Sequence, residues 1–315
     1  MGERHEVGVV GARGHTGAEL VRLIRGHPRL ELAFAGSREL AGQPVPGQDE
    51  VRFESIGPDE LATSGVEAVF LALPDGAGAS HVEAVGESIV IVDISADHRF
   101  DDGWQYGLPE LFREELKGAT RIANPGCYAT ATQIALAPMV DLISGVPAVF
   151  GVSGFSGAGS APGPRNDPDR LSDNLMPYQL VGHNHEREAT RHLGIPVRFM
   201  PHVHPAFRGL LVTAHVPLAR PASHDEVRAR FEADYGEEPL IEVVDRAPEL
   251  RDGAGHPGVI VGGFQTSADG LNAVVVAAED NLLKGAAVQA IQNLNLALGL
   301  PELEGLVGLD ASRPR

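Results

Sequence analysis

Cys127 is the single cysteine of the 315-residue chain, in the run Asn-Pro-Gly-Cys-Tyr-Ala-Thr. Before it, Arg121–Ala123 predicts a short strand; after it, Tyr128–Ala137 predicts a helix that Pro138 ends. A helix N-terminus lowers the pKa of a thiol, and its free amides can stabilise a developing oxyanion. A lone cysteine is more often a small buried hydrophobic residue. Its place at a strand-to-helix turn nevertheless predicts a nucleophile.

A base for this thiol is predicted in the run His-Asn-His-Glu-Arg-Glu that ends at Glu188. His185 and Glu188 are three residues apart, so on a helix they share a face and the carboxylate can orient the imidazole. His183 would lie about 200° around an ideal helix from His185. We therefore expect the helix to begin near His185, with His183 in the preceding loop.

Metal binding is the alternative for this cluster, since two histidines and a glutamate can be ligands. The spacing lacks the i, i+4 histidine pair of a helical zinc site, so no metal is expected. A second histidine pair, His202 and His204, has Pro201 and Pro205 beside it. We interpret that pair as loop packing.

The segment Gly151–Ser160 combines small residues with free amides and hydroxyls, a composition that can form an anion-binding nest. A flexible connection into the proline-rich stretch 162–168 is the alternative interpretation. Arg208, just before a predicted strand, has a guanidinium that could hold a carboxylate or phosphate with two hydrogen bonds. The expected substrate-binding residues are Asn124, Ser153, Gly154, Ser156 and Arg208.

Near the N-terminus, a glycine-rich turn runs from Gly11 to Gly17, between a predicted strand at Glu6–Ala12 and a predicted helix at Thr16–Arg25. Glycines there let the backbone approach a pyrophosphate, whose charge the helix amides meet. The spacing G-x-x-G-x-x-G differs from the usual G-x-G-x-x-G, so a plain tight turn is the alternative. The second strand ends at Ser37-Arg38, which offers a 2′-phosphate a hydroxyl and a cation and so favours NADP(H) over NAD.

The elements around these residues predict two kinds of domain. Up to Ile94, short apolar runs alternate with helix-compatible stretches, a pattern typical of a doubly wound parallel sheet. After Cys127, longer runs with few helices predict an α+β domain with a mostly antiparallel sheet. The expected strands there are 148–153, 197–199, 209–218, 258–265 and 272–278, and the last helix is Asn281–Leu298. The fold class is therefore α/β with an additional α+β catalytic domain.

Composition limits the function classes. Lys and Arg number 25 against 43 Asp and Glu, a formal charge of −18. Such a chain repels phosphate backbones and anionic lipid, so nucleic-acid and membrane partners are not expected. One cysteine excludes an internal disulfide framework, no apolar run approaches the length of a membrane span, and the N-terminus lacks a signal-peptide pattern. We expect a soluble, cytoplasmic protein.

The motifs GARGHTGAEL, YGLPEL, NPGCYATATQIALAP, GHNHERE and DNLLKGAAVQAIQNLNLALG together resemble the N-acetyl-gamma-glutamyl-phosphate reductase family of arginine biosynthesis. The resemblance runs from Val7 to Gly299. It implies the semialdehyde dehydrogenase and glyceraldehyde-3-phosphate dehydrogenase architecture: a dinucleotide-binding domain of residues 1–127 and 281–315, and an inserted catalytic and oligomerisation domain of residues 128–280. A homodimer or homotetramer is expected.

The resemblance also implies a reaction, the NADPH-dependent reduction of N-acetyl-L-glutamyl 5-phosphate to the 5-semialdehyde and phosphate through a thioester on Cys127. His185 would move the proton, His183 would orient the substrate, and Glu188 would support His185. The cofactor-binding residues would be Gly11, Arg13, Gly14, His15, Thr16, Gly17, Ser37, Arg38, Pro74 and Asn281.

Two departures from the family pattern stand out. Arg13 and His15 replace a serine and a tyrosine in the cofactor loop. Ser160-Ala-Pro replaces the basic residues that often follow Gly-Ala-Gly, which leaves the substrate phosphate without an assigned cation. Two alternative functions stay open: an aminoadipyl-phosphate reductase of carrier-linked lysine biosynthesis, and a non-enzymatic NADP-binding regulator.

Overall fold

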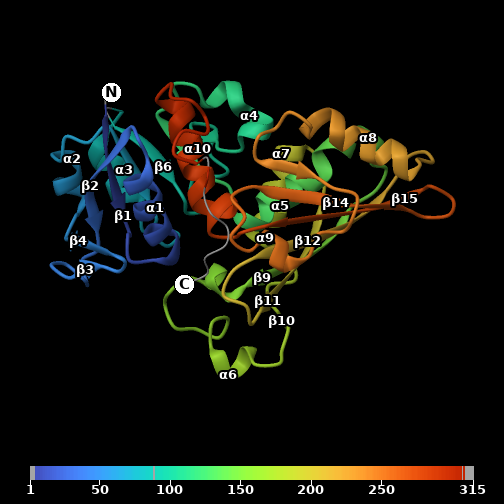
Figure 1. The fold of residues 1–315 in the computed structure, drawn as a ribbon, viewed down its shortest axis with the longest axis horizontal. Helices are drawn as coiled ribbons and strands as arrows, with labels where there is room; N and C mark the ends of the chain where they lie inside the picture. Colours follow the sequence, from blue (N-terminus) through green and yellow to red (C-terminus); the bar gives the residue numbers. More distant parts are fainter. Residues whose placement is uncertain (1–3, 88, 307, 309–315) are drawn as a thin grey trace. The chain divides into compact units, whose positions relative to one another are not determined.

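The structure is a computed structural model that describes residues 4–87, 89–306 and 308 (Figure 1). The chain divides into two compact units. The first unit ends at Gly126 and resumes at Ala286, and the second is the continuous segment Cys127–Gly285. Cys127 is thus the first residue of the second unit, and Asn281 also belongs to that unit.

The first unit contains an eight-stranded sheet in the order β3-β4-β2-β1-β5-β6-β8-β7. All neighbouring strands pair in parallel except β3 and β4, which confirms the doubly wound parallel sheet. The short strands β3 and β7 and the polar strand β4 were not predicted. The strands are β1 (His5–Val10), β2 (Leu30–Gly36), β3 (Pro44–Val45), β4 (Gln48–Glu54), β5 (Ala68–Leu71), β6 (Val90–Asp93), β7 (Gln105–Tyr106) and β8 (Arg121–Ala123).

Helices α1 (His15–Gly26), α2 (Pro58–Ala62), α3 (Ala79–Val85), α4 (Pro109–Leu116) and α10 (Val288–Ala297) complete the first unit. The apolar face of α1 is buried, as its 3.6-residue periodicity predicts. Helix α10, drawn in red in Figure 1, is buried along most of its length. Its Gln289 and Asn293 side-chain amides donate to the carbonyl of Gly107, so the returning helix is fixed by hydrogen bonds as well as by packing.

The expected last helix was placed too early in the chain. Leu283–Ala287 forms a π-helical turn, η3, and α10 begins only at Val288. The Asp280 side chain accepts from the amide of Leu282, and the Asp280 carbonyl accepts from the amide of Gly285, five residues on. This i, i+5 bond is the π-helical pattern and explains why a regular α-helix cannot start at Asn281.

The second unit contains a seven-stranded sheet in the order β10-β11-β9-β12-β15-β14-β13. Four of its strand pairs are antiparallel and two are parallel, which confirms a mostly antiparallel sheet. The strands are β9 (Ala148–Gly154), β10 (Met176–Pro177), β11 (Arg198–His204), β12 (Leu210–Pro217), β13 (Ile241–Val243), β14 (Val259–Thr266) and β15 (Asn272–Glu279).

The interpretation of His202 and His204 as loop residues was wrong, because both lie in β11, which is longer than predicted. The flanking prolines suggested a loop. Strand β11 pairs along its whole length with β9, whereas β10 on its other side pairs at only two positions. A proline is tolerated where one neighbour of the strand is so short.

The helices of the second unit are α5 (Cys127–Leu136), α6 (Pro168–Leu171), α7 (Asn184–Leu193), α8 (His224–Tyr235) and α9 (Leu250–Gly253), with 3₁₀ turns η1 (Ala137–Leu142) and η2 (Phe155–Ala158). Helix α5 is buried from Tyr128 to Leu136, against α7 and strands β12, β14 and β15. In the described part of the chain, no helix has the length and apolar character needed to cross a membrane.

Gly17 and Gly14 make a matched pair for testing the glycine-rich turn. A Cβ atom at Gly17 would lie 2.4 Å from the carbonyl oxygen of Gly11, whereas one at Gly14 would lie 3.6 Å from it. We expect Gly17→Ala to lower the free energy of unfolding by about 1–3 kcal/mol through overpacking. Urea denaturation should show a lower midpoint for Gly17→Ala and a smaller decrease for Gly14→Ala, in which α1 only exchanges its N-cap glycine for the poorer alanine. Because alanine is the better helix former, equal or higher stability of Gly17→Ala would contradict the close contact.

Candidate active site

The turn before the predicted nucleophile is held by Asn124, which is fully buried. Its backbone amide donates to the carbonyl of Asp93 at 2.7 Å, and its carbonyl accepts from the Arg99 guanidinium at 2.9 Å. Its side chain donates to the carbonyl of Ala286 at 3.3 Å and accepts from the Asn293 amide at 3.0 Å. All these partners belong to the first unit. We therefore propose that Asn124 positions the turn, in place of the substrate contact expected from the sequence.

Cys127 follows this turn as the first residue of α5 and is only partly buried, between buried neighbours on both sides. Gly285 packs directly against it: a Cβ atom at Gly285 would lie 2.7 Å from the Cβ atom of Cys127 and 2.8 Å from a carboxylate oxygen of Glu279. Only glycine fits there. The fully buried carboxylate of Glu279 is therefore close to the cysteine.

The structure brings the two predicted histidines together. His183 is the N-cap of α7, and its Nδ1 accepts a hydrogen bond from the backbone amide of His185 at 3.1 Å. The two ring centroids lie 4.7 Å apart. The expectation that the helix begins near His185, with His183 in the preceding loop, is confirmed. Since Nδ1 is an acceptor, the neutral ring of His183 carries its proton on Nε2.

Tyr128 links the cysteine helix to the histidines. Its ring lies 5.9 Å from that of His185 and 4.8 Å from that of Phe199, and its hydroxyl donates to the carbonyl of His202 at 2.7 Å. Burial raises the pKa of Tyr128 well above its usual value. The phenol is therefore neutral near pH 7. Glu188 is fully buried on α7, and its predicted pairing with His185 stays a prediction.

The serine- and glycine-rich segment Gly151–Ser160 forms hydrogen bonds with Asn281 and within itself in the second unit. The Asn281 amide donates to the hydroxyl of Ser156 at 2.8 Å, and its carbonyl oxygen accepts from the amide of Gly209 at 3.0 Å. The hydroxyl of Ser153 donates to the carbonyl of Gly154 at 3.1 Å. Asn281 thus joins η2 to the start of β12, and its expected nicotinamide contact stays a prediction.

Arg208 lies 3.4 Å from the carboxylate of Asp280, which is fully buried. The same carboxylate accepts from the amides of Gly255 at 2.6 Å and Leu282 at 2.8 Å. The positive charge of Arg208 is therefore largely compensated by a carboxylate within the fold. Its expected role as an anion clamp stays a prediction.

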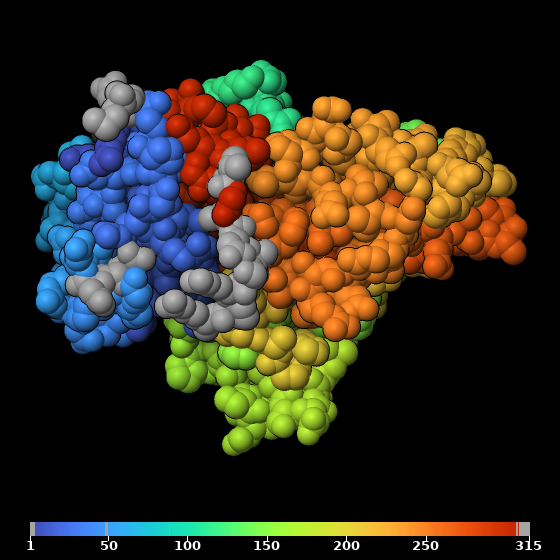
Figure 2. Space-filling model, in the orientation of Figure 1, coloured from blue at the N-terminus to red at the C-terminus, as the bar shows by residue number. Residues whose placement is uncertain are grey.

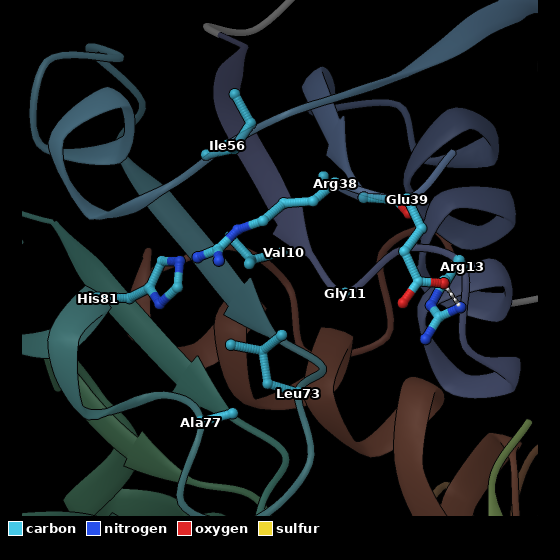
Figure 3. Close-up of a pocket in the computed structure, with 11 residues that line it drawn as sticks. Val10, Gly11, Arg13, Arg38, Glu39, Ile56, Leu73, Ala77 and His81 are labelled. Atoms are coloured by element: carbon cyan, nitrogen blue, oxygen red, sulfur yellow. Dashed lines mark hydrogen bonds and ion pairs between the residues drawn. The ribbon is translucent and has the colours of Figure 1, made fainter. Parts of the chain in front are cut away.

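The first unit has a separate cavity of about 320 Å³ at the carboxyl ends of β1 and β2 (Figure 3). Gly11, Arg13, Ser37 and Arg38 line it, as the sequence predicts for a dinucleotide site. At Gly11 the backbone has φ of +86°, and an added Cβ atom would lie 2.2 Å from the carbonyl oxygen of Ala72. The turn therefore requires glycine.

The cavity fits an anionic ligand. Ser37 is 8% exposed, and among the described residues its hydroxyl has no hydrogen-bond partner. Arg13 forms an ion pair with Glu39, whereas for Arg38 the described part of the chain offers no carboxylate partner. In Figure 3 the Arg38 side chain extends along the cavity towards His81. A donor hydroxyl and an unneutralised guanidinium are the groups that a 2′-phosphate needs.

His81 of α3 was not predicted. It is 3% exposed, and its pKa is lowered by burial, with a smaller contribution from the charge of Arg38, while the carbonyl of Ile56 acts in the opposite direction. The imidazole that ends the cavity is therefore neutral near pH 7. No motif in the sequence indicates that His81 lies at this cavity, because α3 is connected to β5 by its own loop, apart from the glycine-rich turn.

Other predicted cofactor residues lie beside this cavity without lining it. Gly14 is the N-cap of α1, and His15 and Thr16 are its first residues, where the amides have no intrahelical acceptor. Pro74 follows β5. Within residues 4–87, 89–306 and 308, no group of three or more His, Cys, Asp and Glu side chains is arranged to hold a metal ion.

Comparisons with known proteins cover nearly the whole chain. Residues 6–119 match the family described as "Semialdehyde dehydrogenase, NAD binding domain", and residues 127–281 match "Semialdehyde dehydrogenase, dimerisation domain". The chain is 53% identical over 308 residues to the N-acetyl-gamma-glutamyl-phosphate reductase of Stenotrophomonas maltophilia, with 95% of this chain and 97% of the relative covered. The enzyme of the same name from Xylella fastidiosa is 48% identical, with 95% and 94% covered.

Solved structures show the same fold at low identity. Aspartate semialdehyde dehydrogenase II from Vibrio cholerae, complexed with ASA, has a TM-score of 0.78 at 19% identity and covers 95% of this chain and 99% of its own. Aspartate semialdehyde dehydrogenase with NADP from Candida albicans has a TM-score of 0.74 at 18% identity, with 94% and 99% covered. These likenesses confirm the predicted fold class.

His183 has a structural role as the N-cap of α7, which can be tested apart from its proposed role in catalysis. We expect His183→Ala to lower the free energy of unfolding by about 0.5–2 kcal/mol, because α7 loses its N-cap. His183→Asn should retain most of the stability, because asparagine is a good N-cap. Urea denaturation followed by circular dichroism measures the difference. Equal midpoints for the two variants would show that the cap contributes nothing.

Proposed function

The chain belongs to the N-acetyl-gamma-glutamyl-phosphate reductase family, and from that premise we propose that it reduces N-acetyl-L-glutamyl 5-phosphate to N-acetyl-L-glutamate 5-semialdehyde and phosphate with NADPH, a step of arginine biosynthesis. One observation supports the proposal most directly. The partly exposed Cys127 stands at the N-terminus of α5, in the same unit as the adjoining pair His183 and His185. This is the arrangement that an acyl-transferring thiol requires.

In the proposed mechanism, Cys127 and the first turn of α5 carry out the acyl transfer. The Cys127 thiolate attacks the acyl phosphate carbon, phosphate leaves, and a thioester forms on sulfur. The amides of the first turn of α5 stabilise the oxyanion of each tetrahedral species. NADPH, when bound, supplies the hydride that reduces the thioester carbonyl. The resulting hemithioacetal collapses to the semialdehyde and returns the thiolate.

The histidines have different tasks in this scheme. His183 uses Nδ1 to cap α7, so its Nε2–H is the group that can donate to the substrate. His185, with Glu188 one helical turn away, delivers the proton to the hemithioacetal oxygen and removes it again. The tautomer of His183 supports this division, because an imidazole whose Nδ1 is a cap acceptor is poorly suited to shuttle protons.

Ser37 and Arg38 support NADP(H) as the cofactor, since they would meet the 2′-phosphate at the end of β2. Dimerisation through the second unit is supported by the description of the family that residues 127–281 match, and we propose a homodimer or homotetramer. A single thiol that must remain reduced favours a cytoplasmic enzyme. The names of the relatives favour the glutamyl substrate over the aminoadipyl one.

The reaction is tested most directly with the nucleophile. Cys127→Ser should lose at least about a thousandfold in phosphate-dependent NADP reduction with N-acetylglutamate semialdehyde, because an alcohol is a far poorer nucleophile near neutral pH. NADPH titration should show unchanged affinity and serves as the folding control. Near-normal turnover would reject the covalent mechanism. A preference of the unsubstituted enzyme for the aminoadipate homologue would favour the lysine-pathway alternative.

Cofactor choice is tested at Arg38. Arg38→Ala should weaken NADPH binding by about 1.5–3 kcal/mol, roughly ten- to hundredfold, and leave NADH binding nearly unchanged. Arg25→Ala, an exposed arginine of α1 outside the cavity, is the matched control. Fluorescence titration with both cofactors gives the dissociation constants. An equal loss for the two cofactors would assign Arg38 a structural role.

A further inference from the structure

The reaction proposed above releases phosphate, and a site that binds an acyl phosphate needs a cation for its phosphoryl group. Basic residues do not follow Gly159, where Ser160-Ala-Pro stands. Arg208, the cation predicted from the sequence, lies 3.4 Å from the buried carboxylate of Asp280. The second unit has another positive side chain in the loop that precedes α6.

That side chain is Arg165. Its guanidinium carbon lies 4.8 Å from the ring centroid of Tyr178, stacked over the phenol. Tyr178 in turn meets His183 edge to face at 5.6 Å, and His183 lies 4.7 Å from His185. A continuous row of contacts thus leads from Arg165 through Tyr178 and His183 to His185, the proposed proton carrier.

The pKa of Tyr178 depends on the charges of both Cys127 and Arg165. Burial raises its pKa, the negative charge of a Cys127 thiolate raises it further, and the positive charge of Arg165 lowers it. The thiolate and the guanidinium therefore lie near the same phenol and shift its pKa in opposite directions.

The loop that carries Arg165 is closed by its neighbour Asn166. The Asn166 amide donates to the carbonyls of Gly159 at 2.9 Å and Ala161 at 2.8 Å, and its oxygen accepts from the amide of Gly163 at 2.7 Å. Figures 1 and 2 show this yellow-green segment at the surface of the second unit. A substrate anion can therefore approach a guanidinium whose backbone is already ordered.

The Arg165 guanidinium also interacts with the phenol oxygen of Tyr178, which lowers the pKa of Tyr178. A guanidinium has five N–H donors, so donors remain for bidentate binding of phosphate. The nearest acidic residue along the chain, Asp167, accepts from the amide of Asp169 at 3.0 Å and caps α6. Within the described chain, Arg165 has no carboxylate partner.

We propose that Arg165, stacked on Tyr178, binds the phosphoryl group of the acyl phosphate and replaces the basic residues absent after Gly159. The proposal rests on the function proposed above. The substrate also carries carboxylate groups, which a guanidinium binds with the same chemistry. The reverse reaction separates these two anions, because phosphate and the semialdehyde are then independent substrates.

The kinetic test measures the reverse reaction. Arg165→Ala should raise the KM for phosphate at least tenfold and leave the KM for the semialdehyde and for NADP within twofold. Arg165→Lys should lie between, since it retains the charge and loses the planar fork. Arg170→Ala, an exposed arginine of α6, is the matched control and should behave like the unsubstituted enzyme. A rise confined to the KM for the semialdehyde would overturn the proposal in favour of a carboxylate site, and no change would also overturn it.

A second test needs no turnover. Inorganic phosphate should protect Cys127 from alkylation by iodoacetamide, and Arg165→Ala should raise the half-protecting phosphate concentration at least tenfold, whereas Arg170→Ala should not. Absence of protection in the unsubstituted protein, or equal protection in both variants, would overturn the proposal. If the expected shift occurs while N-acetylglutamate semialdehyde is not a substrate, the phosphate site stands and the proposed function fails.

Discussion

The backbone of Gly285 packs against Cys127, and this contact requires glycine at position 285. A side chain there would meet both the cysteine and the carboxylate of Glu279. The π-helical turn Leu283–Ala287 carries this glycine, and the turn in turn depends on Asp280, whose carbonyl accepts from the Gly285 amide. Since the Asp280 carboxylate also forms an ion pair with Arg208, one buried residue supports the turn that packs against Cys127 and compensates the charge of Arg208.

Several residues that the sequence indicates as candidate functional residues also stabilise the fold. His183 caps α7 through Nδ1, Asn281 joins η2 to β12, and Asn124 fixes the turn before Cys127. Each of these residues therefore positions other groups of the fold, in addition to any contact with a ligand. Loss of function in a variant of such a residue has two possible causes, and a conservative replacement that retains the hydrogen bond separates them.

Local patterns of the sequence predicted much of this molecule. The strand, glycine turn and helix around Gly11, the helix that starts at Cys127, and the loop position of His183 all follow from spacing of apolar residues, glycines and caps. Contacts between distant segments could not be predicted in this way. His81 lines the cavity of the first unit from α3, Arg165 contacts Tyr178, which lies beyond α6 in the chain, and β11 continues through Pro201 because of its neighbours in the sheet.

The discontinuity of the first unit has a consequence for the order of events on the ribosome. All of Cys127–Gly285 is synthesised before α10 exists, so the Gly107 carbonyl and the Asn124 side chain of a nascent chain lack their partners on that helix. The described part of the second unit is one continuous segment, and all of it has been synthesised by then. Because domains fold as units during synthesis, it can fold while the first unit is still incomplete. The turn that leads to Cys127 is then completed last, when α10 emerges.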